Sequence, residues 1–184
     1  MVVFAEGKNS EPDYVNGLKN LPHISENTAL KLEVHPEQGT PLTLVEMAVA
    51  RQQDSEIDEC WCLFDVEWPK HHPNLEKAIA LAAASNIKLA ISNPCFEVWL
   101  ILHLKAHTRF VDTKDAERTS KGLDGRTGKS IDAAKYLPHR KEAALRARAL
   151  ARRHSDAGTR FPHDNPSSGM YRFLEAVEGN SSQP

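Results

Sequence analysis

The sequence lacks any apolar run long enough to cross a membrane, since no stretch approaches 18 consecutive apolar residues. It also lacks the pattern of a signal peptide, an internal repeat and a low-complexity block. Its formal net charge is only -2, so any contact with nucleic acid must come from a local basic patch. With 184 residues and 40% hydrophobic residues, the chain is long enough to bury the core of one domain. We therefore expect a soluble, cytoplasmic, single-domain protein without a membrane partner.

Cysteine is also scarce, with Cys60, Cys62 and Cys95 as the only three. An odd number of cysteines within apolar runs does not suggest a disulfide framework. Cys60 and Cys62 share one face of an expected strand, but no second Cys/His pair follows at zinc-finger spacing. A zinc site is therefore not favoured.

The most informative stretch is the apolar run at residues 60–64, which is followed by Asp65 and Glu67. Such a run is typical of a strand buried on both faces of a parallel sheet, and ligands bind at the C-terminal edge of such sheets. Carboxylates at i and i+2 of a strand point to the same side. Because they repel each other, we expect a cation between them, and Mg2+ is the common choice for oxygen ligands. The alternative is a strand that ends in a solvated acidic turn.

The rest of the first 104 residues alternates between strand and helix patterns. We expect further strands at residues 2–5, 29–35 and 88–91, the last stopped by Ser92, Asn93 and Pro94. We expect helices at residues 10–18, 41–53, 75–84 and 95–104, with Ser10 as the N-cap of the first. This βαβαβαβα order predicts an α/β fold with a parallel β-sheet and helices on both faces.

More acidic residues fall at the same expected edge. Glu6 follows the first strand, and Glu97 begins the helix after the fourth strand. Glu6, Glu97 and the pair after residue 64 can therefore face one crevice. Glu11, considered alone, is interpreted as a first-turn acid that the helix dipole favours.

The last 80 residues have a different character. We expect a mobile loop or short helices at residues 108–130, a basic helix at 131–154 interrupted by Pro138, and a final helix at 169–177 capped by residues 165–168. This divides the single domain into an α/β core at 1–104, a C-terminal helical extension at 105–178 and a disordered tail at 179–184. The chain begins almost directly on its first strand, and we expect either that a short leader is missing or that the start is as written.

Several motifs in the chain are ambiguous. Arg140, Lys141, Arg148 and Arg152 in the basic helix are interpreted either as a solvated face or as contacts to a phosphate backbone. Residues 125–130 resemble a P-loop, but the required first glycine is replaced by Leu123 and no buried strand precedes them. Adjacent His71 and His72 are interpreted as exposed, although they lie near the expected metal edge. His103, Trp61 and Trp99 are interpreted as core residues.

Four of these motifs together resemble those of a known family. They are Glu6-Gly-x-x-x-Glu11-Pro12, the acidic pair, the block Ser92-Asn93-Pro94-Cys95-Phe96-Glu97-Val98-Trp99-Leu100, and Asn165-Pro166-Ser167-Ser168. They resemble the RloB-like family of bacterial abortive-infection and restriction-associated proteins, which in turn resembles Toprim-domain nucleases. The resemblance therefore implies a Toprim-like sheet with a Glu after its first strand and Asp-x-Asp after its third. The chain departs from this pattern at Glu67, which stands where a second Asp is usual.

The resemblance implies a nuclease that depends on Mg2+ or Mn2+, with DNA or RNA as substrate. It assigns catalysis to Glu6, Asp65 and Glu67, and metal binding to these three together with Glu11 and Glu97. Lys8 would neutralise phosphoryl charge. The implied role is anti-phage defence beside an ATPase partner. Two alternatives remain open: a non-catalytic module that binds a nucleotide or docks an ATPase, and a phosphohydrolase that acts on small molecules.

Overall fold

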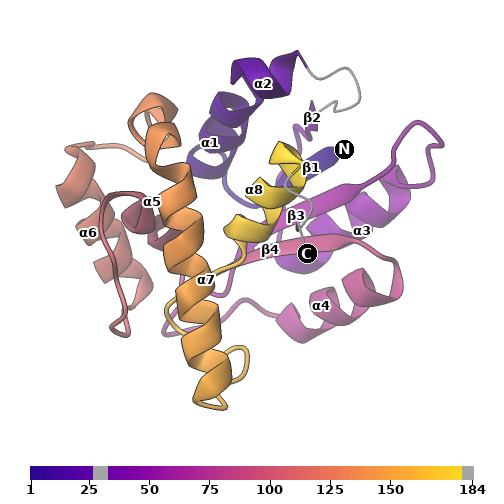
Figure 1. Cartoon of the computed structure of the whole chain (residues 1–184). Helices are drawn as coiled ribbons and strands as arrows, with labels where there is room; N and C mark the ends of the chain where they lie inside the picture. The colour runs from indigo at the N-terminus through magenta and orange to yellow at the C-terminus, as the bar shows by residue number, and fades with distance from the viewer. Residues whose placement is uncertain (27–32, 180–184) are drawn as a thin grey trace.

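The computed structural model describes residues 1–26 and 33–179, and its centre is a five-stranded sheet in the order β2-β1-β3-β4-β5. The strands are β1 (Val2–Ala5), β2 (Glu33–Val34), β3 (Cys60–Asp65), β4 (Lys88–Asn93) and β5 (Ser167–Ser168). The first four run parallel, and β5 runs antiparallel to β4. The α/β fold with a mostly parallel sheet flanked by helices is confirmed (Figure 1).

Eight α-helices and two 3-10 helices are found among the described residues. They are α1 (Ser10–Lys19), α2 (Pro22–Ser25), α3 (Pro41–Arg51), α4 (Leu75–Ala84), α5 (Glu97–Leu104), α6 (Thr113–Asp124), η1 (Ala133–Lys135), η2 (Leu137–His139), α7 (Arg140–Asp156) and α8 (Met170–Glu178). None of these helices is long and apolar enough to cross a membrane.

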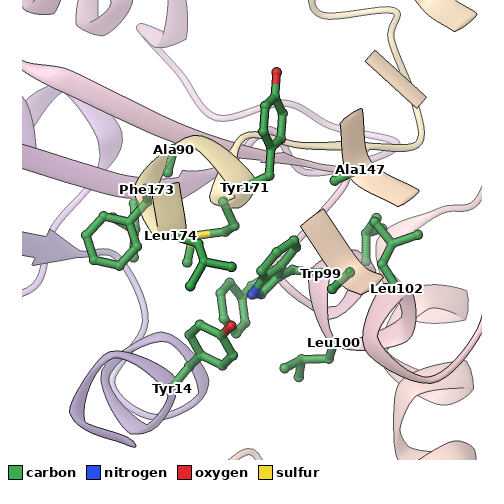
Figure 2. Packing of buried hydrophobic residues seen from close by; sticks show 14 of the residues in the cluster. Tyr14, Ala90, Trp99, Leu100, Leu102, Ala147, Tyr171, Phe173 and Leu174 are labelled. Atoms are coloured by element: carbon green, nitrogen blue, oxygen red, sulfur yellow. The ribbon is translucent and has the colours of Figure 1, made fainter. Parts of the chain in front are cut away.

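The sheet separates two apolar clusters, because successive side chains of a strand point to opposite faces. Cys60, Cys62 and Phe64 of β3 pack toward α3 and α4. Trp61 and Leu63 of the same strand pack on the other face, toward α1 and the helices from α5 onward. Figure 2 shows the centre of this second cluster, where side chains from α1, α5 and α8 meet. Residues before and after position 104 therefore share one core.

The end of β4 differs from the prediction. The strand was expected to stop before Ser92, yet it continues through Asn93, because Ser92 pairs with Ser168 and Asn93 with Ser167. The segment at 165–168, expected only as a helix cap, supplies β5 for this pairing. A pairing between residues so far apart in sequence leaves no periodic pattern in either segment.

Three other local expectations also change. Residues 108–130, expected to form a mobile loop or short helices, contain the 12-residue helix α6, whose N-cap Asp112 accepts a hydrogen bond from the N–H of Asp115 at 2.7 Å. Ser10 is not the N-cap of α1 but its first residue, and its hydroxyl donates to the carbonyl of Lys129 at 2.8 Å. Pro138 lies in η2, before the basic helix begins at Arg140. Of the expected strand at 29–35, positions 29–32 lie outside the described residues, as do positions 180–184 of the expected tail.

Candidate functional site

The carboxylates singled out in the sequence come together at the C-terminal edge of the sheet. Glu6 follows β1, Asp65 ends β3, and Glu97 begins α5 just after β4. Parallel pairing places the ends of β1, β3 and β4 side by side. Glu11 reaches the same place from the first turn of α1. These four residues form what we call the acidic cluster.

Glu6 links two neighbouring elements at this edge. Its Oε2 accepts a hydrogen bond from the backbone N–H of Asp65 at 3.0 Å, and its Oε1 lies 2.6 Å from Nε2 of His72. The hydrogen bond to the Glu6 carboxylate raises the pKa of His72, although burial of the ring opposes this rise. The sequence-based interpretation of His72 as an exposed turn residue is wrong, since its side chain is only 21% exposed and is paired with Glu6.

Glu11 is not a simple first-turn acid on the surface. It is buried, and its carboxylate lies so close to Gly7 that a Cβ at position 7 would overlap it. Glycine at position 7 therefore lets the loop after β1 pass over this side chain. Burial is the main reason that the pKa of Glu11 rises to about 7, and the charges of Glu97 and Glu6 raise it further.

Asp65 is the centre of the cluster. Its pKa lies well above its usual range, first because burial disfavours the charged form, and then because Glu11, Glu6, Glu97 and Glu67 repel its charge. When a cation approaches carboxylates that raise one another's pKa in this way, it stabilises their charged forms. Among these acids, Asp65 is therefore the one whose charged form a nearby cation would stabilise most.

Contrary to the sequence-based prediction, Glu67 does not lie on the same strand face as Asp65. β3 ends at Asp65, and Glu67 has a positive φ of 65°, which turns the chain away from the strand geometry. Its Oε2 accepts a hydrogen bond from the hydroxyl of Thr113 at 2.8 Å. Burial raises its pKa, although this hydrogen bond opposes the rise. Glu67 therefore stands at the rim of the cluster.

Positive charge reaches the cluster from an unexpected segment. Arg126, within the stretch that resembles a P-loop, lies with Nη2 3.6 Å from Oε1 of Glu97, while its Nη1 donates to Asp124 at 2.7 Å. Lys129 of the same stretch lines a hollow of about 290 Å³ together with Lys8 and with Glu6, Glu11 and Glu97 of the acidic cluster. Sequence reasoning missed Arg126 and Lys129, and the contact of Lys129 with Ser10 spans 119 positions, which no local signal reveals.

The basic residues of α7 do not line this hollow. Arg140 pairs with Glu178 at 2.6 Å, and Arg148 pairs with Glu175, so carboxylates neutralise both charges. Lys141 and Arg152 are exposed. Of the four α7 residues predicted to contact phosphate, these two retain unpaired charge among the described residues.

His103 and the two tryptophans are core residues, as expected. Trp61 is 5% exposed and Trp99 is fully buried. His103 is buried on α5, with Nδ1 2.8 Å from the carbonyl oxygen of Trp99 and Nε2 3.1 Å from the hydroxyl of Tyr14. Its interactions lie within the core rather than at the acidic cluster.

The acidic cluster offers carboxylate oxygens to a divalent metal ion. Within residues 1–26 and 33–179, no three His, Cys, Asp or Glu side chains converge closely enough to form a ready metal site. The chemistry of the donors nevertheless suits a hard cation, because the cluster offers carboxylate oxygens whose charges are only partly balanced. Asp65, Glu11 and Glu97 are the residues that would hold such an ion, with Glu6 beside them.

Comparison with known proteins gives one match. A family model described as "RloB-like protein" matches residues 1–177, almost the whole chain. No curated protein and no solved structure matches this chain.

Proposed function

Because the chain belongs to the RloB-like protein family, we propose that it is a nuclease that hydrolyses phosphodiester bonds of nucleic acid with the help of Mg2+ or Mn2+. The observation that carries this proposal is the convergence of Glu6, Glu11, Asp65 and Glu97 at the C-terminal edge of the sheet, where burial and the neighbouring carboxylates raise the pKa of Asp65. A cation relieves this repulsion, and a phosphodiester supplies the negative charge that the cation then attracts.

Hydrolysis forms a bond between phosphorus and a water oxygen and breaks the bond to the leaving oxygen. The water loses one proton, and the leaving oxygen gains one. When bound, a divalent ion lowers the pKa of a water and stabilises the leaving oxygen. Asp65, Glu11 and Glu97 would hold such an ion, and Glu67 would support its position from the rim.

The residues around the acids perform the remaining tasks. Glu6 is oriented by the N–H of Asp65 and by His72, so it can take a proton from the attacking water. Lys8 and Lys129 line the hollow beside the acids and neutralise charge on the phosphoryl oxygens. Because both lysines sit on loops, they adapt to the substrate while the sheet fixes the carboxylates.

The direct test is a cleavage assay with single-stranded DNA, duplex DNA and tRNA, in Mg2+, Mn2+ or EDTA. Wild type is compared with Asp65→Asn, which keeps the shape of the side chain and removes its charge, and with Lys19→Ala as a surface control. We expect cleavage that requires the metal, falls at least 100-fold in Asp65→Asn and is unchanged in Lys19→Ala. Cleavage that survives Asp65→Asn contradicts the assignment.

One observation favours a second function, a non-catalytic module that binds a nucleotide or docks an ATPase. Glu67 accepts a hydrogen bond from the hydroxyl of Thr113 and is turned out of the strand geometry, so the usual acidic pair is not formed. Thermal unfolding separates the two possibilities. A metal-dependent enzyme is stabilised by millimolar Mg2+ or Mn2+ in wild type but not in Asp65→Asn, whereas a docking module shows no such difference.

The proposed biological role is anti-phage defence in the cytoplasm, beside an ATPase partner, as the family resemblance implies. A plaque assay in cells that carry the gene with its neighbours tests this role. We expect protection with wild type and its loss with Asp65→Asn. Equal protection by both would show that the acidic cluster is not needed for defence.

A further inference from the structure

We propose that a single-stranded stretch of nucleic acid is bound in a cleft separate from the acidic cluster, through its phosphates and one or more unpaired bases. The cleft has a volume of about 720 Å³, and Arg160, Phe161, Tyr171 and Arg172 are among the residues that line it. This inference rests on the proposed function, because it names the form of nucleic acid that the site takes.

The cleft lies beside the outer side of β4. Its walls come from α4, the C-terminal end of α7, the loop at 158–161 and the start of α8. Leu89 and Ile91 of β4, together with Ile79 of α4, provide an apolar floor. On this side, β5 pairs with β4 only at Ser92 and Asn93, so among the described residues no strand covers the first part of β4. Strands and helices of the fold therefore form the cleft, which has an apolar floor and polar walls.

The positive charges in the cleft are not neutralised by neighbouring acids. Arg160 is exposed and makes no ion pair within the described part of the chain. Arg172 is also exposed, and its Nε donates a hydrogen bond to the hydroxyl of Tyr171 at 3.0 Å. Asp164 is the acid of the cleft, and its two oxygens accept hydrogen bonds from Asn93 and Ser167. These arginines contrast with Arg140 and Arg148 of α7, which pair with glutamates.

Aromatic side chains accompany these charges. Phe161 is partly exposed. Tyr171 is only 9% exposed, and the guanidinium groups of Arg148 and Arg172 lie 5.7 and 5.4 Å from the centre of its ring, so Phe161 is the aromatic side chain that is open to a base. Figure 2 shows the Tyr171 ring pointing away from the centre of the apolar cluster, unlike Leu174 of the same helix. A cationic groove with aromatic rings binds single strands, because unpaired bases stack on the rings while phosphates meet the cations. The bases of a duplex are stacked inside it and do not offer their faces.

The cleft is connected to the acidic cluster through shared residues. Phe161 also lines a second hollow of about 370 Å³, whose other residues include His71, His72 and Lys77. His72 in turn contacts Glu6 of the acidic cluster. A strand that occupies the cleft can therefore pass Phe161 and the two histidines and present a phosphodiester to the carboxylates.

Binding is tested without cleavage, by fluorescence anisotropy of labelled 12-nucleotide probes in EDTA. The probes are oligo-dT, oligo-rU and a DNA duplex of the same length, and they are titrated with the full chain. We expect both single strands to bind more tightly than the duplex. Phe161→Ala should weaken their binding about tenfold, because one base loses its stacking partner. Arg160→Glu should weaken it at least tenfold and make the salt dependence shallower.

Lys19→Glu is the matched control, since it reverses one exposed charge on α1 outside both hollows. It should change binding less than twofold, and thermal unfolding verifies that every variant is folded. If wild type binds no probe, if duplex binds as tightly as single strands, or if Lys19→Glu weakens binding as much as Arg160→Glu does, the inference is overturned. Cleavage by wild type and its loss in Asp65→Asn are measured separately, so the nuclease proposal can stand or fall independently of the cleft.

Discussion

Protonation of His103 should destabilise the fold in mild acid. Nδ1 of this ring lies 2.8 Å from the carbonyl oxygen of Trp99, which can only accept, so Nδ1 carries the proton of the neutral ring. Nε2 then accepts a hydrogen bond from the Tyr14 hydroxyl, 3.1 Å away. Protonation of Nε2 would break the hydrogen bond that this atom accepts from Tyr14, and it would place a positive charge in the core. Burial is the main cause that lowers the pKa of His103 from 6.5 to about 4.

The size of the effect follows from this shift. A difference of about 2.5 pH units between the folded and unfolded pKa corresponds to about 3 kcal/mol in the free energy of unfolding. Above pH 6.5 the ring is neutral in both states, and the fold has its full stability. As the pH falls from 6.5 toward 4, the unfolded state binds the proton first, so stability is progressively lost. Glu11 acts in the opposite direction, because its raised pKa favours the folded state at low pH.

Urea unfolding at pH 7.5, 6.0, 5.0 and 4.5 separates these contributions by comparing wild type with His103→Leu. The carboxylates titrate in both proteins, so the difference between the two curves reports His103. We expect the variant to be less stable at pH 7.5, because Tyr14 loses its partner, and the gap to narrow by about 2 kcal/mol or more at pH 4.5. His163→Leu controls for the loss of an exposed histidine. Parallel curves for wild type and His103→Leu would refute the reasoning.

The remaining predictions concern single positions. Glu11→Gln should raise the melting temperature of the metal-free protein at pH 8 by several degrees and have little effect at pH 5, because the carboxyl with a pKa of about 7 is charged only at the higher pH. Scanning fluorimetry in EDTA measures both melting temperatures, and millimolar Mg2+ should reduce the difference between wild type and variant. Gly7→Ala should destabilise the chain by about 1–3 kcal/mol in urea and reduce cleavage, since its Cβ would overlap the Glu11 carboxylate; unchanged stability contradicts this contact. Gly169→Ala should also destabilise, because its Cβ would lie 3.0 Å from the backbone nitrogen of Ile91, whereas Gly122→Ala, in open space on α6, should stabilise by about 0.5–1 kcal/mol in the same measurement.

The parts of the fold that sequence reasoning predicted are those with strong local patterns. The unbroken apolar run of β3 and the Ala-rich α4 are examples, since burial on one or both faces dictates their residues. β5 could not be predicted, because its two serines become a strand only by pairing with residues 92 and 93. α6 was missed for a related reason. Its sequence is polar and glycine-containing, and only Ala116 and Ser120 are buried.

The candidate site divides in the same way. Glu6 and Asp65 could be placed together because each ends a strand of a parallel sheet, and parallel strands end at one edge. The pairing of His72 with Glu6 depends on how the loop after β3 folds back, which the residue types do not reveal. Arg126 arrives near Glu97 because α6 packs against α5, a tertiary contact between segments of different periodicity. The sequence therefore located the carboxylates and Lys8, but not Arg126 and Lys129.

The shared core has a consequence for folding during synthesis. β1, β3 and β4 are complete once residue 93 has been made, yet one face of the sheet is covered by side chains as late as Phe173 and Val177. At about 5–20 residues per second, a ribosome needs roughly 4–17 seconds to make the intervening 84 residues. During that interval Trp61, whose ring packs against Phe173 in the folded protein, lacks part of its apolar cover in the nascent chain. The chain is thus exposed to aggregation or chaperone capture until its final helix emerges, and a stop codon that removes α8 should send the protein to inclusion bodies even though every residue of the acidic cluster has been made.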